Sequence, residues 1–496
     1  MPTPNGAPYD VAIVGAGVCG AAIARLLSRY RLRVALLERE ADVSFGTSKA
    51  NSGIVHGGFH HAAHFLKTRL EVAGAARFDR LREELGFPFA RCGILVAASH
   101  PDDMPAIEHL RAQGEANGIK NLEICSRQRM LELEPKLSPE VCGGLYAPDG
   151  GIVEPYRYVF ALVENARANG VELLTEFEAC AAERIADPEA KLPLWAIRSS
   201  DGRTVRARFA VNAAGLFADA VSAAFGAERY EIRPRKGEYF LLDRLAEGHP
   251  GRVVFPVPNA VSKGMLVIPT VEGTTLIGPT ADPVDDKDDV ATTQARLSRI
   301  VESAKTLVPS VSEKDAITSF AGLRPVLGED FYVAPSDIAE AFVQVAGVQS
   351  PGLTASPAIA EYVRDLLAGL GLDLTEKADW NPRVEAPVRP RNLPPEERAA
   401  LVAANPAHGH IVCRCEEVSE AEIVEAIRHG HVTLDGIKFY TRAQMGRCQG
   451  GFCTYRIIRI LMRETGMSFD EITKRGKGSR ILESELGDEG HETHRI

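Results

Sequence analysis

The chain has 496 residues, of which 45% are hydrophobic and 25% are charged. This length exceeds that of a single ordinary core, so two or three domains are expected, and the composition is that of a globular protein rather than a disordered one. The formal net charge is −10, and no cluster of Lys and Arg is dense enough to neutralise a run of phosphates. A nucleic-acid partner is therefore not expected.

The first apolar run, residues 11–24, has no basic segment before it and is interrupted by glycine. It is shorter than the roughly 18 apolar residues that a spanning helix needs, so neither a signal peptide nor a transmembrane segment is predicted. We therefore expect a cytoplasmic protein. The sequence leaves peripheral docking at a membrane open, and no pattern indicates an oligomeric state.

Strand and helix patterns alternate along the first half of the chain. A short apolar strand over residues 10–15 leads through a glycine turn into an alanine-rich helix that reaches about Tyr30, and a second strand ends at Glu38. A helix near 156–169 and a strand near 208–213 continue the pattern. This alternation predicts an α/β fold.

The second half of the chain changes character twice. Residues 230–280 are rich in strand and loop patterns, a helix is predicted at about 291–307, and a strand–turn–helix unit occupies 341–369. Six prolines within residues 381–409 then favour a stiff, extended linker. A helical module of about 65 residues follows, and a polar tail begins at about Gly476.

Residues 15–20 (GAGVCG) follow the first strand and open the first helix. In this context Gly15 permits a tight turn, Gly17 lets the backbone approach a pyrophosphate, and Gly20 permits close packing of helix on strand. The helix N-terminus offers N–H groups and a positive dipole end to phosphates. Glu38 stands 18 residues beyond Gly20, where a carboxylate can accept from ribose hydroxyls. A dinucleotide site is predicted, and an ordinary glycine-rich turn is the alternative.

Two later segments resemble motifs of the D-amino-acid-oxidase-like superfamily of flavoproteins. Residues 211–215 (VNAAG), with Asp219, are similar to its second flavin-contact strand, and residues 347–354 (GVQSPGLT) are similar to its last FAD motif. A helix expected from about Ala355 would stabilise negative charge on a reduced flavin through its N-terminus. The resemblance implies that the nucleotide is FAD.

Residues 47–58 (TSKANSGIVHGG) resemble the bacterial glycerol-3-phosphate oxidases and, slightly less, the L-2-hydroxyglutarate oxidases. Further matches are Lys263-Gly264, residues 320–325 (FAGLRP) and residues 350–354 (SPGLT), so the resemblance covers about residues 9–380. It implies oxidation of a small anionic secondary alcohol. In that reaction hydride passes from carbon to flavin N5 while a base takes the hydroxyl proton.

This chemistry requires a base and a group that holds an anion. Histidine titrates near neutrality, and the resemblance makes His56 the base. By the same resemblance, Arg324 would hold the substrate's phosphate or carboxylate through a planar fork, and Lys263 would hold it as a point charge. The alternatives are a structural histidine and a solvated surface lysine. The implied cofactor contacts are Gly15, Gly17, Gly20, Glu38, Arg39, Thr47, Ser48, Asn51, Ser52, Gly215, Gly347, Ser350, Gly352, Leu353 and Thr354.

Histidines also stand at positions 60, 61 and 64. Two histidines four residues apart on a helix make a metal-ligand geometry. Because Gly57-Gly58 makes a continuous helix doubtful, we expect these extra histidines at the substrate entrance or at the surface.

Nine cysteines are present, and four of them crowd into the tail: Cys413, Cys415, Cys448 and Cys453. In a reducing compartment, clustered thiols indicate metal ligands rather than disulfides. Their spacing, with a capping box of Ser419 and Glu422, resembles the bacterioferritin-associated-ferredoxin-like [2Fe-2S] domain. This domain also occurs fused to the large subunit of anaerobic glycerol-3-phosphate dehydrogenase. Four thiolates suffice for one [2Fe-2S] cluster, and a zinc tetrathiolate is the alternative.

The predicted architecture is a discontinuous Rossmann-type FAD domain of the α/β class, an inserted β-rich substrate domain, and a small C-terminal helical iron–sulfur domain. The expected boundaries are 1–90, 150–225 and 320–380 for the FAD domain, 91–149 and 226–319 for the substrate domain, 381–409 for the Pro-rich linker, 410–475 for the [2Fe-2S] domain and 476–496 for the polar tail.

The favoured function is an FAD-dependent dehydrogenase that oxidises sn-glycerol 3-phosphate to dihydroxyacetone phosphate. Its electrons would pass through the [2Fe-2S] cluster to an electron-acceptor protein or partner subunit. L-2-hydroxyglutarate or another 2-hydroxy acid is the second substrate choice. Oxidation of C–N bonds in amino, opine or imino acids is an alternative reaction, and an electron-transfer subunit with a vestigial pocket is an alternative role. Gln349 stands where the similar oxidases carry lysine, which argues against direct reaction with oxygen.

Overall fold

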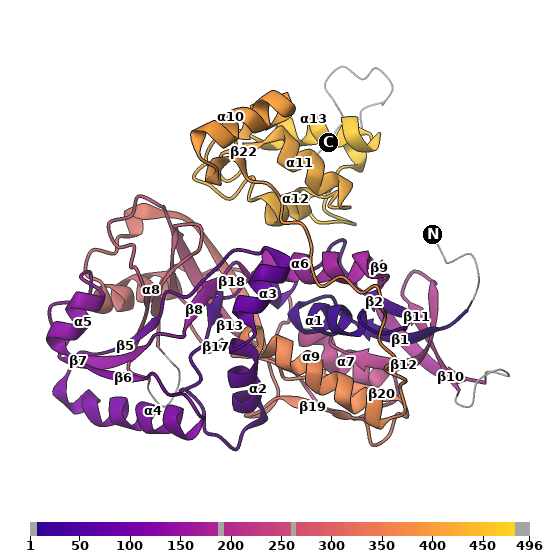
Figure 1. Ribbon diagram of the computed structural model, residues 1–496, viewed down its shortest axis with the longest axis horizontal. Helices are drawn as coiled ribbons and strands as arrows, with labels where there is room; N and C mark the ends of the chain where they lie inside the picture. Colours follow the sequence, from indigo (N-terminus) through magenta and orange to yellow (C-terminus); the bar gives the residue numbers. More distant parts are fainter. Residues whose placement is uncertain (1–6, 187–192, 259–263, 482–496) are drawn as a thin grey trace, which may run out of the picture. The chain divides into compact units, whose positions relative to one another are not determined.

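The computed structural model describes residues 7–186, 193–258 and 264–481. The chain forms two compact units (Figure 1). One comprises Met1–Arg39 with Val43–Glu385, and the other comprises Glu40–Asp42 with Ala386–Ile496. Within the described ranges, no helix is both long enough and apolar enough to cross a bilayer.

The larger unit contains an eight-stranded sheet with a parallel centre. Its strands are Tyr9–Val14 (β1), Val34–Leu37 (β2), Glu172–Leu174 (β9), Ala179–Ile185 (β10), Leu194–Ser199 (β11), Thr204–Asn212 (β12), Tyr332–Pro335 (β19) and Phe342–Ala346 (β20). The main path is β10-β11-β12-β1-β2-β9, and β20 joins β12 to β19. β9, β2, β1, β12 and β20 pair in parallel. β2 and β20 are buried along their whole length, as expected for parallel strands that are covered on both faces.

Helices pack on this sheet and fix the ends of its strands. They are Val18–Leu27 (α1), Pro155–Ala168 (α6), Ala218–Ala224 (α7) and Gly352–Gly369 (α9). α1 packs against both α6 and α9, and small residues on α1 allow these close approaches. The strands predicted near 10–15 and 208–213 and the helix predicted near 156–169 correspond to β1, β12 and α6. The α/β expectation for this part of the chain is confirmed.

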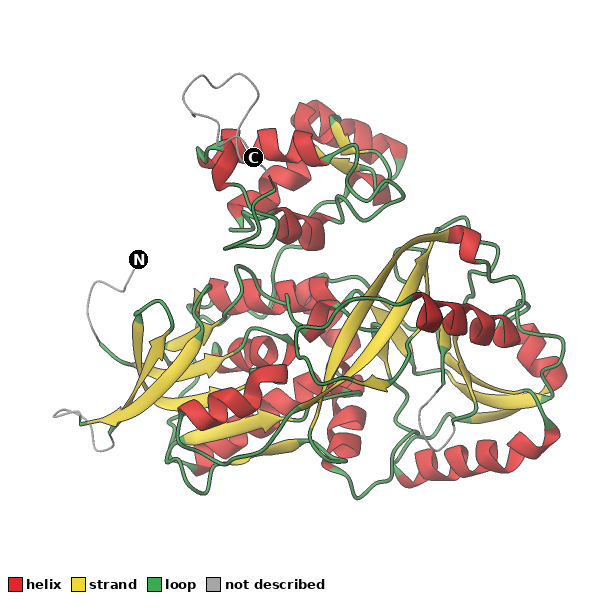
Figure 2. Cartoon of the chain, turned by 180° about the vertical axis from the view of Figure 1, so that it is seen from behind, coloured by secondary structure: helices red, strands yellow, loops and turns green. Residues whose placement is uncertain are grey.

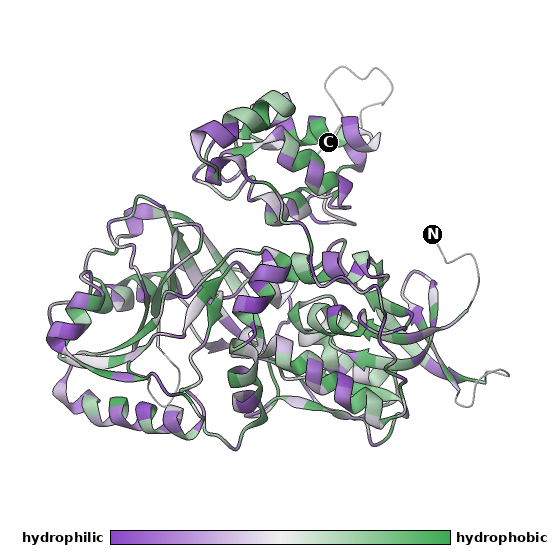
Figure 3. Ribbon diagram, in the orientation of Figure 1, coloured by the Kyte–Doolittle hydropathy of each residue, from purple (hydrophilic) through white to green (hydrophobic). Residues whose placement is uncertain are grey.

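A second, nine-stranded sheet forms the β-rich part of the larger unit. Its strands are Ile94–Ala98 (β5), Glu123–Ser126 (β6), Gly143–Ala147 (β7), Arg233–Leu242 (β13), Val253–Pro256 (β14), Leu266–Pro269 (β15), Thr275–Gly278 (β16), Asp282–Pro283 (β17) and Ala316–Val326 (β18). The helices of this region are Met104–Ala116 (α4), Arg127–Leu133 (α5) and Gln294–Leu307 (α8). Purple and green residues alternate along α4 in Figure 3, as in an amphipathic helix with one buried face. Figure 2 shows both sheets from behind.

A small sheet holds the segment that carries His56. It consists of Ile54–Val55 (β3), Phe89–Ala90 (β4) and Gly151–Val153 (β8), and β8 pairs antiparallel with both partners. The helices Leu66–Ala75 (α2) and Phe78–Leu85 (α3) follow β3 in the chain. α2 packs against α9. Residues 54–56 lie beside the beginning of α9, because Thr354 Oγ1 donates to the Ile54 carbonyl oxygen.

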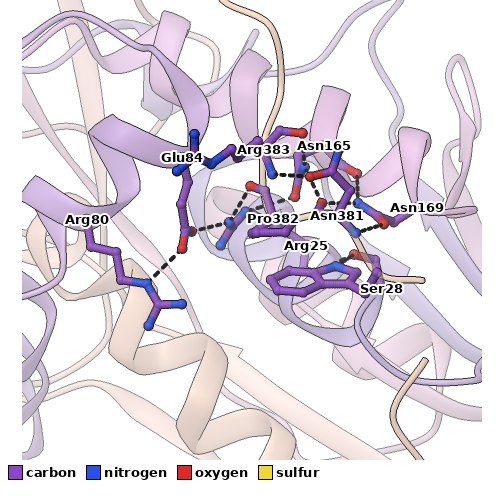
Figure 4. A network of polar contacts seen from close by, with 10 residues as sticks. Arg25, Ser28, Arg80, Glu84, Asn165, Asn169, Asn381, Pro382 and Arg383 are labelled. Atoms are coloured by element: carbon purple, nitrogen blue, oxygen red, sulfur yellow. Dashed lines mark hydrogen bonds and ion pairs between the residues drawn. The ribbon is translucent and has the colours of Figure 1, made fainter. Parts of the chain in front are cut away.

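A buried polar network fastens the end of the larger unit to its helices (Figure 4). Asn165 on α6 is fully buried, donates to the carbonyl oxygens of Asn381 and Arg383, and accepts from Nε of Arg25 at 3.0 Å. Arg25 also forms a 2.6 Å ion pair with Glu84. The first residues of the predicted linker are therefore held on α1, α3 and α6.

The smaller unit is helical. Its elements are Pro395–Ala404 (α10), Ile411–Cys413 (β21), Val418–Ser419 (β22), Glu420–Arg428 (α11), Leu434–Thr441 (α12) and Thr454–Thr465 (α13). The predicted capping box is present, since the side chains of Ser419 and Glu422 each accept from the other residue's backbone N–H. The Pro-rich segment differs from the expected extended linker because it contains α10. Pro395 occupies the first turn of that helix, where no N–H is needed.

Candidate active site and cysteine pairs

The turn between β1 and α1 requires glycine at two positions. Gly15 has a φ of +104°, and a Cβ on Gly20 would lie 1.8 Å from the carbonyl oxygen of Gly15. A side chain at Gly20 would push α1 away from the turn, and one at Gly15 would collide with the backbone of Ala213 as well as straining its own backbone. α1 begins at Val18 with no acidic residue in its first turn, so its positive end suits a phosphate. The turn therefore fits the pyrophosphate role predicted for it.

Two side chains hold this turn from outside. Oε2 of the buried Glu38 accepts from the Ala16 N–H at 2.7 Å, and Ser48 Oγ accepts from the Val18 N–H at 2.9 Å. The Glu38 carboxylate is thus fixed at the edge of the turn, the position from which an acidic residue accepts from a ribose hydroxyl in dinucleotide-binding folds. The Arg39 guanidinium lies over the ring of Phe217, 3.7 Å from its centre.

The polar segment that begins at Thr47 is tied to the second sheet. Thr47 Oγ1 donates to the carbonyl oxygen of Leu323 on β18 at 2.7 Å. Ser52 Oγ lies 3.2 Å from the phenol oxygen of Tyr239 on β13. Asn51 closes the loop by donating to the Ser48 carbonyl and accepting from the Gly53 N–H. Because Ser48 of the same segment also contacts the Val18 N–H, the segment connects the second sheet with the turn between β1 and α1.

His56 lies where two predicted motifs meet. Its backbone N–H donates to Thr354 Oγ1 at 3.0 Å, and Thr354 Oγ1 donates in turn to the Ile54 carbonyl at 3.2 Å. Ser350 Oγ lies 3.3 Å from His56 Nε2. The imidazole is buried, with 8% of the residue exposed, so its orientation is well fixed. The His56 segment and the loop before α9 thus form one constellation.

Arg324, which is predicted to hold the anionic group of the substrate, lies on β18 directly after Leu323. Its Nη2 donates to the carbonyl oxygen of Thr280 at 3.3 Å. A Cβ on Gly237 of the neighbouring strand β13 would lie 2.8 Å from the same Nη2, so the guanidinium runs close over that backbone. One weak carbonyl contact leaves most of the guanidinium donors for a further acceptor. Lys263 lies outside the described residues.

The other predicted cofactor contacts lie at turns. Gly215 and Gly347 have φ values of +56° and +64°. Gly352 and Leu353 open α9, which begins three residues earlier than the helix expected from about Ala355. α9 also has no acidic residue in its first turn, so its positive end suits a flavin ring that gains negative charge.

Asp219 has a structural role in this part of the fold. Its carboxylate accepts from Lys287 Nζ at 2.6 and 2.7 Å and from the Ile232 N–H at 2.9 Å. Burial opposes ionisation, but the lysine and the backbone donors outweigh it and hold the pKa of Asp219 below its ordinary value. The carboxylate fastens the start of α7 to the segment that precedes β13.

The sequence did not single out Tyr239 or Thr280, and it left His60 without a defined position. Tyr239 and Thr280 reach the site through strand pairing between distant segments, which no local motif signals. The His60 ring lies 5.8 Å from that of His56 and packs on Phe255 at 5.1 Å. Among the described residues, no three His, Cys, Asp or Glu side chains are grouped so as to hold a single metal ion, so the histidines at 56, 60, 61 and 64 do not form the metal site considered for them, whereas the tail cysteines form pairs.

In the smaller unit the four tail cysteines form two pairs. Cys415 Sγ and Cys448 Sγ lie 3.7 Å apart and both residues are exposed, whereas Cys413 and Cys453 are buried and share an S–H···S hydrogen bond. Two thiolates on one tetrahedral metal with bonds of about 2.3 Å stand roughly 3.8 Å apart. Each pair could therefore hold one iron of a [2Fe-2S] cluster, which takes two thiolates at each iron.

In each pair the environment favours the charged form of one thiol, because the pKa values of Cys413 and Cys448 are lowered whereas those of Cys453 and Cys415 are raised. The hydrogen bond from Cys453 lowers the pKa of Cys413 to about 6, against the effect of burial, and the N–H groups of Gln444 and Glu416 add to this effect. The N–H groups of Phe452 and Gly450 lower the pKa of Cys448. Backbone donors aimed at sulfur stabilise thiolate ligands and cluster sulfur alike.

Comparison with known families agrees with a nucleotide site in the larger unit and a metal site in the smaller one. A family model described as FAD dependent oxidoreductase matches residues 10–366. The chain belongs to this family. A second model, described as a BFD-like [2Fe-2S] binding domain, matches residues 411–463. The protein is an FAD-dependent oxidoreductase with a [2Fe-2S] domain, and the glycine turn and the cysteine pairs fit these two cofactors.

Three individual proteins show which enzymes this chain resembles. A glycerol 3-phosphate dehydrogenase of Caloramator mitchellensis is 42% identical over 477 residues, which are 96% of this chain and 98% of that protein. The structure of dithionite-reduced L-α-glycerophosphate oxidase from Mycoplasma pneumoniae with FAD bound is similar with a TM-score of 0.73 and 31% identity, covering 77% of this chain and 100% of that chain. A mitochondrial L-2-hydroxyglutarate dehydrogenase of Nematostella vectensis is 26% identical over 421 residues, which are 73% of this chain and 90% of that protein.

Proposed function

We propose that this enzyme oxidises sn-glycerol 3-phosphate to dihydroxyacetone phosphate and delivers the electrons to a protein acceptor. The observation that carries the proposal is the His56 constellation, in which Ser350 Oγ contacts a buried imidazole and Thr354 on α9 holds the His56 backbone. The glycerol 3-phosphate dehydrogenase and oxidase relatives support the choice of substrate.

In the proposed reaction His56 takes the proton of the C2 hydroxyl. Nε2 is the nitrogen that Ser350 Oγ reaches, and a substrate hydroxyl would take over this hydrogen bond. The hydrogen bond from the backbone N–H of His56 to Thr354 Oγ1 holds the backbone at His56 against the beginning of α9 while the proton moves. Bound FAD supplies the two-electron acceptor for the hydrogen that leaves C2.

Arg324 and Lys263 would bind the phosphate. The guanidinium of Arg324 offers paired donors to two phosphate oxygens, and the nearby Gly237 backbone limits the positions that the guanidinium can take.

We further propose that the enzyme works in the cytoplasm. Cell fractionation tests this location.

An anaerobic titration of the purified enzyme with sn-glycerol 3-phosphate tests the function. We expect the flavin absorbance to bleach, followed by loss of the oxidised-cluster absorbance. We also expect His56→Ala to bind FAD normally but to slow flavin reduction by about 100-fold or more, in line with loss of a general base. His56→Gln serves as the conservative control, since it keeps a polar side chain but cannot take the proton.

The outcome distinguishes the rival substrates. Bleaching by L-2-hydroxyglutarate alone would move the assignment to 2-hydroxy acids. Bleaching by glycine or proline alone would move it to C–N oxidation. Wild-type flavin reduction in His56→Ala would show that His56 is not the base.

A further inference from the structure

The exposed cysteine pair lies beside a cationic aromatic surface. Phe452 directly precedes Cys453, and the guanidinium groups of Arg414 and Arg456 lie over its ring at 4.6 and 4.5 Å from the centre. Arg414 stands between Cys413 and the exposed Cys415 in the chain. All three side chains of this surface are exposed, including Phe452 with 38% of its residue surface accessible. We call these three residues, with Tyr455 at 56% exposure, the cysteine-edge surface.

The charge around this edge is one-sided. Residues 413–417 and 447–459 contain four exposed arginines: Arg414, Arg447, Arg456 and Arg459. The same segments contain one exposed carboxylate, Glu417, because the other, Glu416, is buried and pairs with Arg391 and Arg442. Among the Lys, Arg, Asp and Glu side chains of these segments, exposed arginines therefore outnumber exposed carboxylates, although the whole chain carries a net charge of −10.

The stacking of Arg414 and Arg456 on Phe452 leaves these two guanidinium groups able to bind an anionic partner. A guanidinium that stacks on an aromatic face uses its flat side, so the N–H groups in its plane remain available for carboxylates. Exposed Phe and Tyr beside Arg are also the residue types that concentrate the binding energy of protein interfaces. Transient redox encounters need only a small contact area, so a surface of four residues can contribute much of such a contact.

We propose that the cysteine-edge surface docks a one-electron acceptor protein whose own redox centre is ringed by carboxylates. The proposal rests on the proposed function for the source of the electrons. Oxidation of one secondary alcohol to a ketone releases two electrons and two protons. Two acceptor molecules are therefore reduced per substrate, each gaining one electron and no atoms, while the protons pass to solvent.

The test uses the full-length holoenzyme, reduced with dithionite and freed of excess reductant, so that its result does not depend on the substrate. Acidic rubredoxin and basic cytochrome c are the two probes, and stopped-flow absorbance follows their reduction. We expect the rate with rubredoxin to fall about tenfold or more between 20 and 300 mM salt, because attraction between opposite charges is screened. The rate with cytochrome c should rise or stay level.

Charge reversal provides the matched comparison. The double variant Arg414→Glu/Arg456→Glu should slow rubredoxin reduction at low salt by about tenfold or more and should speed cytochrome c reduction. Equilibrium binding of oxidised rubredoxin, measured by NMR line broadening, should weaken in parallel. Arg428→Glu is the control, because it changes the same charge at the far end of α11, a helix roughly 13 Å long.

Intact flavin and cluster spectra in the double variant exclude misfolding as the cause. Equal salt dependence for the two probes, or the same loss in Arg428→Glu, would overturn the docking proposal. Loss of flavin reduction by sn-glycerol 3-phosphate with the docking results intact would instead overturn the proposed substrate alone.

Discussion

At the scale of single residues, Asp219 shows how a carboxylate that resembles a cofactor contact stabilises the fold. Its pKa is held below the ordinary value, so its contribution to stability is complete above the unfolded pKa of about 3.9 and is lost as the pH falls through the folded pKa. We expect Asp219→Asn to lower the free energy of unfolding at pH 7 by about 2 kcal/mol. The difference from wild type should shrink below about pH 4.

Urea denaturation at a series of pH values measures this effect. Asp365→Asn is the control, because Asp365 is an exposed carboxylate whose 2.7 Å ion pair with Arg364 should contribute little. A difference between Asp219→Asn and wild type that stays constant from pH 7 to pH 3 would contradict the pKa argument.

At the scale of elements, the network around Asn165 fixes where the larger unit ends. Asn165→Ala removes the acceptor for Arg25 and both donors to the backbone at 381 and 383, leaving buried polar groups without partners. We expect a local destabilisation of roughly 3 kcal/mol, since each such group costs about 1–3 kcal/mol. Hydrogen exchange should increase over residues 377–385 and stay unchanged in β1 and β2.

Trp380 reports the same event, because its indole N–H donates to Ser28 Oγ at 3.2 Å and its ring lies 5.6 Å from the Arg25 guanidinium. The Trp380 fluorescence should therefore shift to the red in Asn165→Ala. Asn169→Ala is the matched control, since Asn169 also donates to the Asn381 carbonyl but is only half-buried and should give a smaller change. Unchanged hydrogen exchange in Asn165→Ala would show that the network does not hold this segment.

Local patterns in the sequence predicted the elements that depend on neighbouring residues. The turn at Gly15 and Gly20 and the cap at Ser419 follow from residues within a few positions, and the structure contains both. Contacts such as Arg324 with Thr280 depend on the register of a sheet built from distant segments, so no motif could predict them. The helix α10 was missed because proline density indicates an extended chain, whereas Pro395 starts a helix equally well.

At the scale of the whole molecule, the proposed function assigns substrate oxidation to the larger unit and electron exit to the smaller one. The predicted active-site residues belong to the larger unit and the cysteine pairs belong to the smaller one. Cys448→Ser removes one ligand from the exposed pair and should abolish the cluster, because serine is a poor substitute for a thiolate at iron. The larger unit has its own core and should keep its FAD.

We therefore expect Cys448→Ser to separate the two half-reactions. Flavin bleaching by sn-glycerol 3-phosphate should proceed within about twofold of the wild-type rate, since no residue of that site has changed. Steady-state reduction of rubredoxin should fall by about 100-fold or more, because the one-electron exit is lost. Cys180→Ser is the control, because Cys180 is an exposed thiol on β10 of the larger unit. If Cys448→Ser lost its cluster signal yet reduced rubredoxin at the wild-type rate, electrons would leave directly from the flavin, and the smaller unit would have a role other than electron exit.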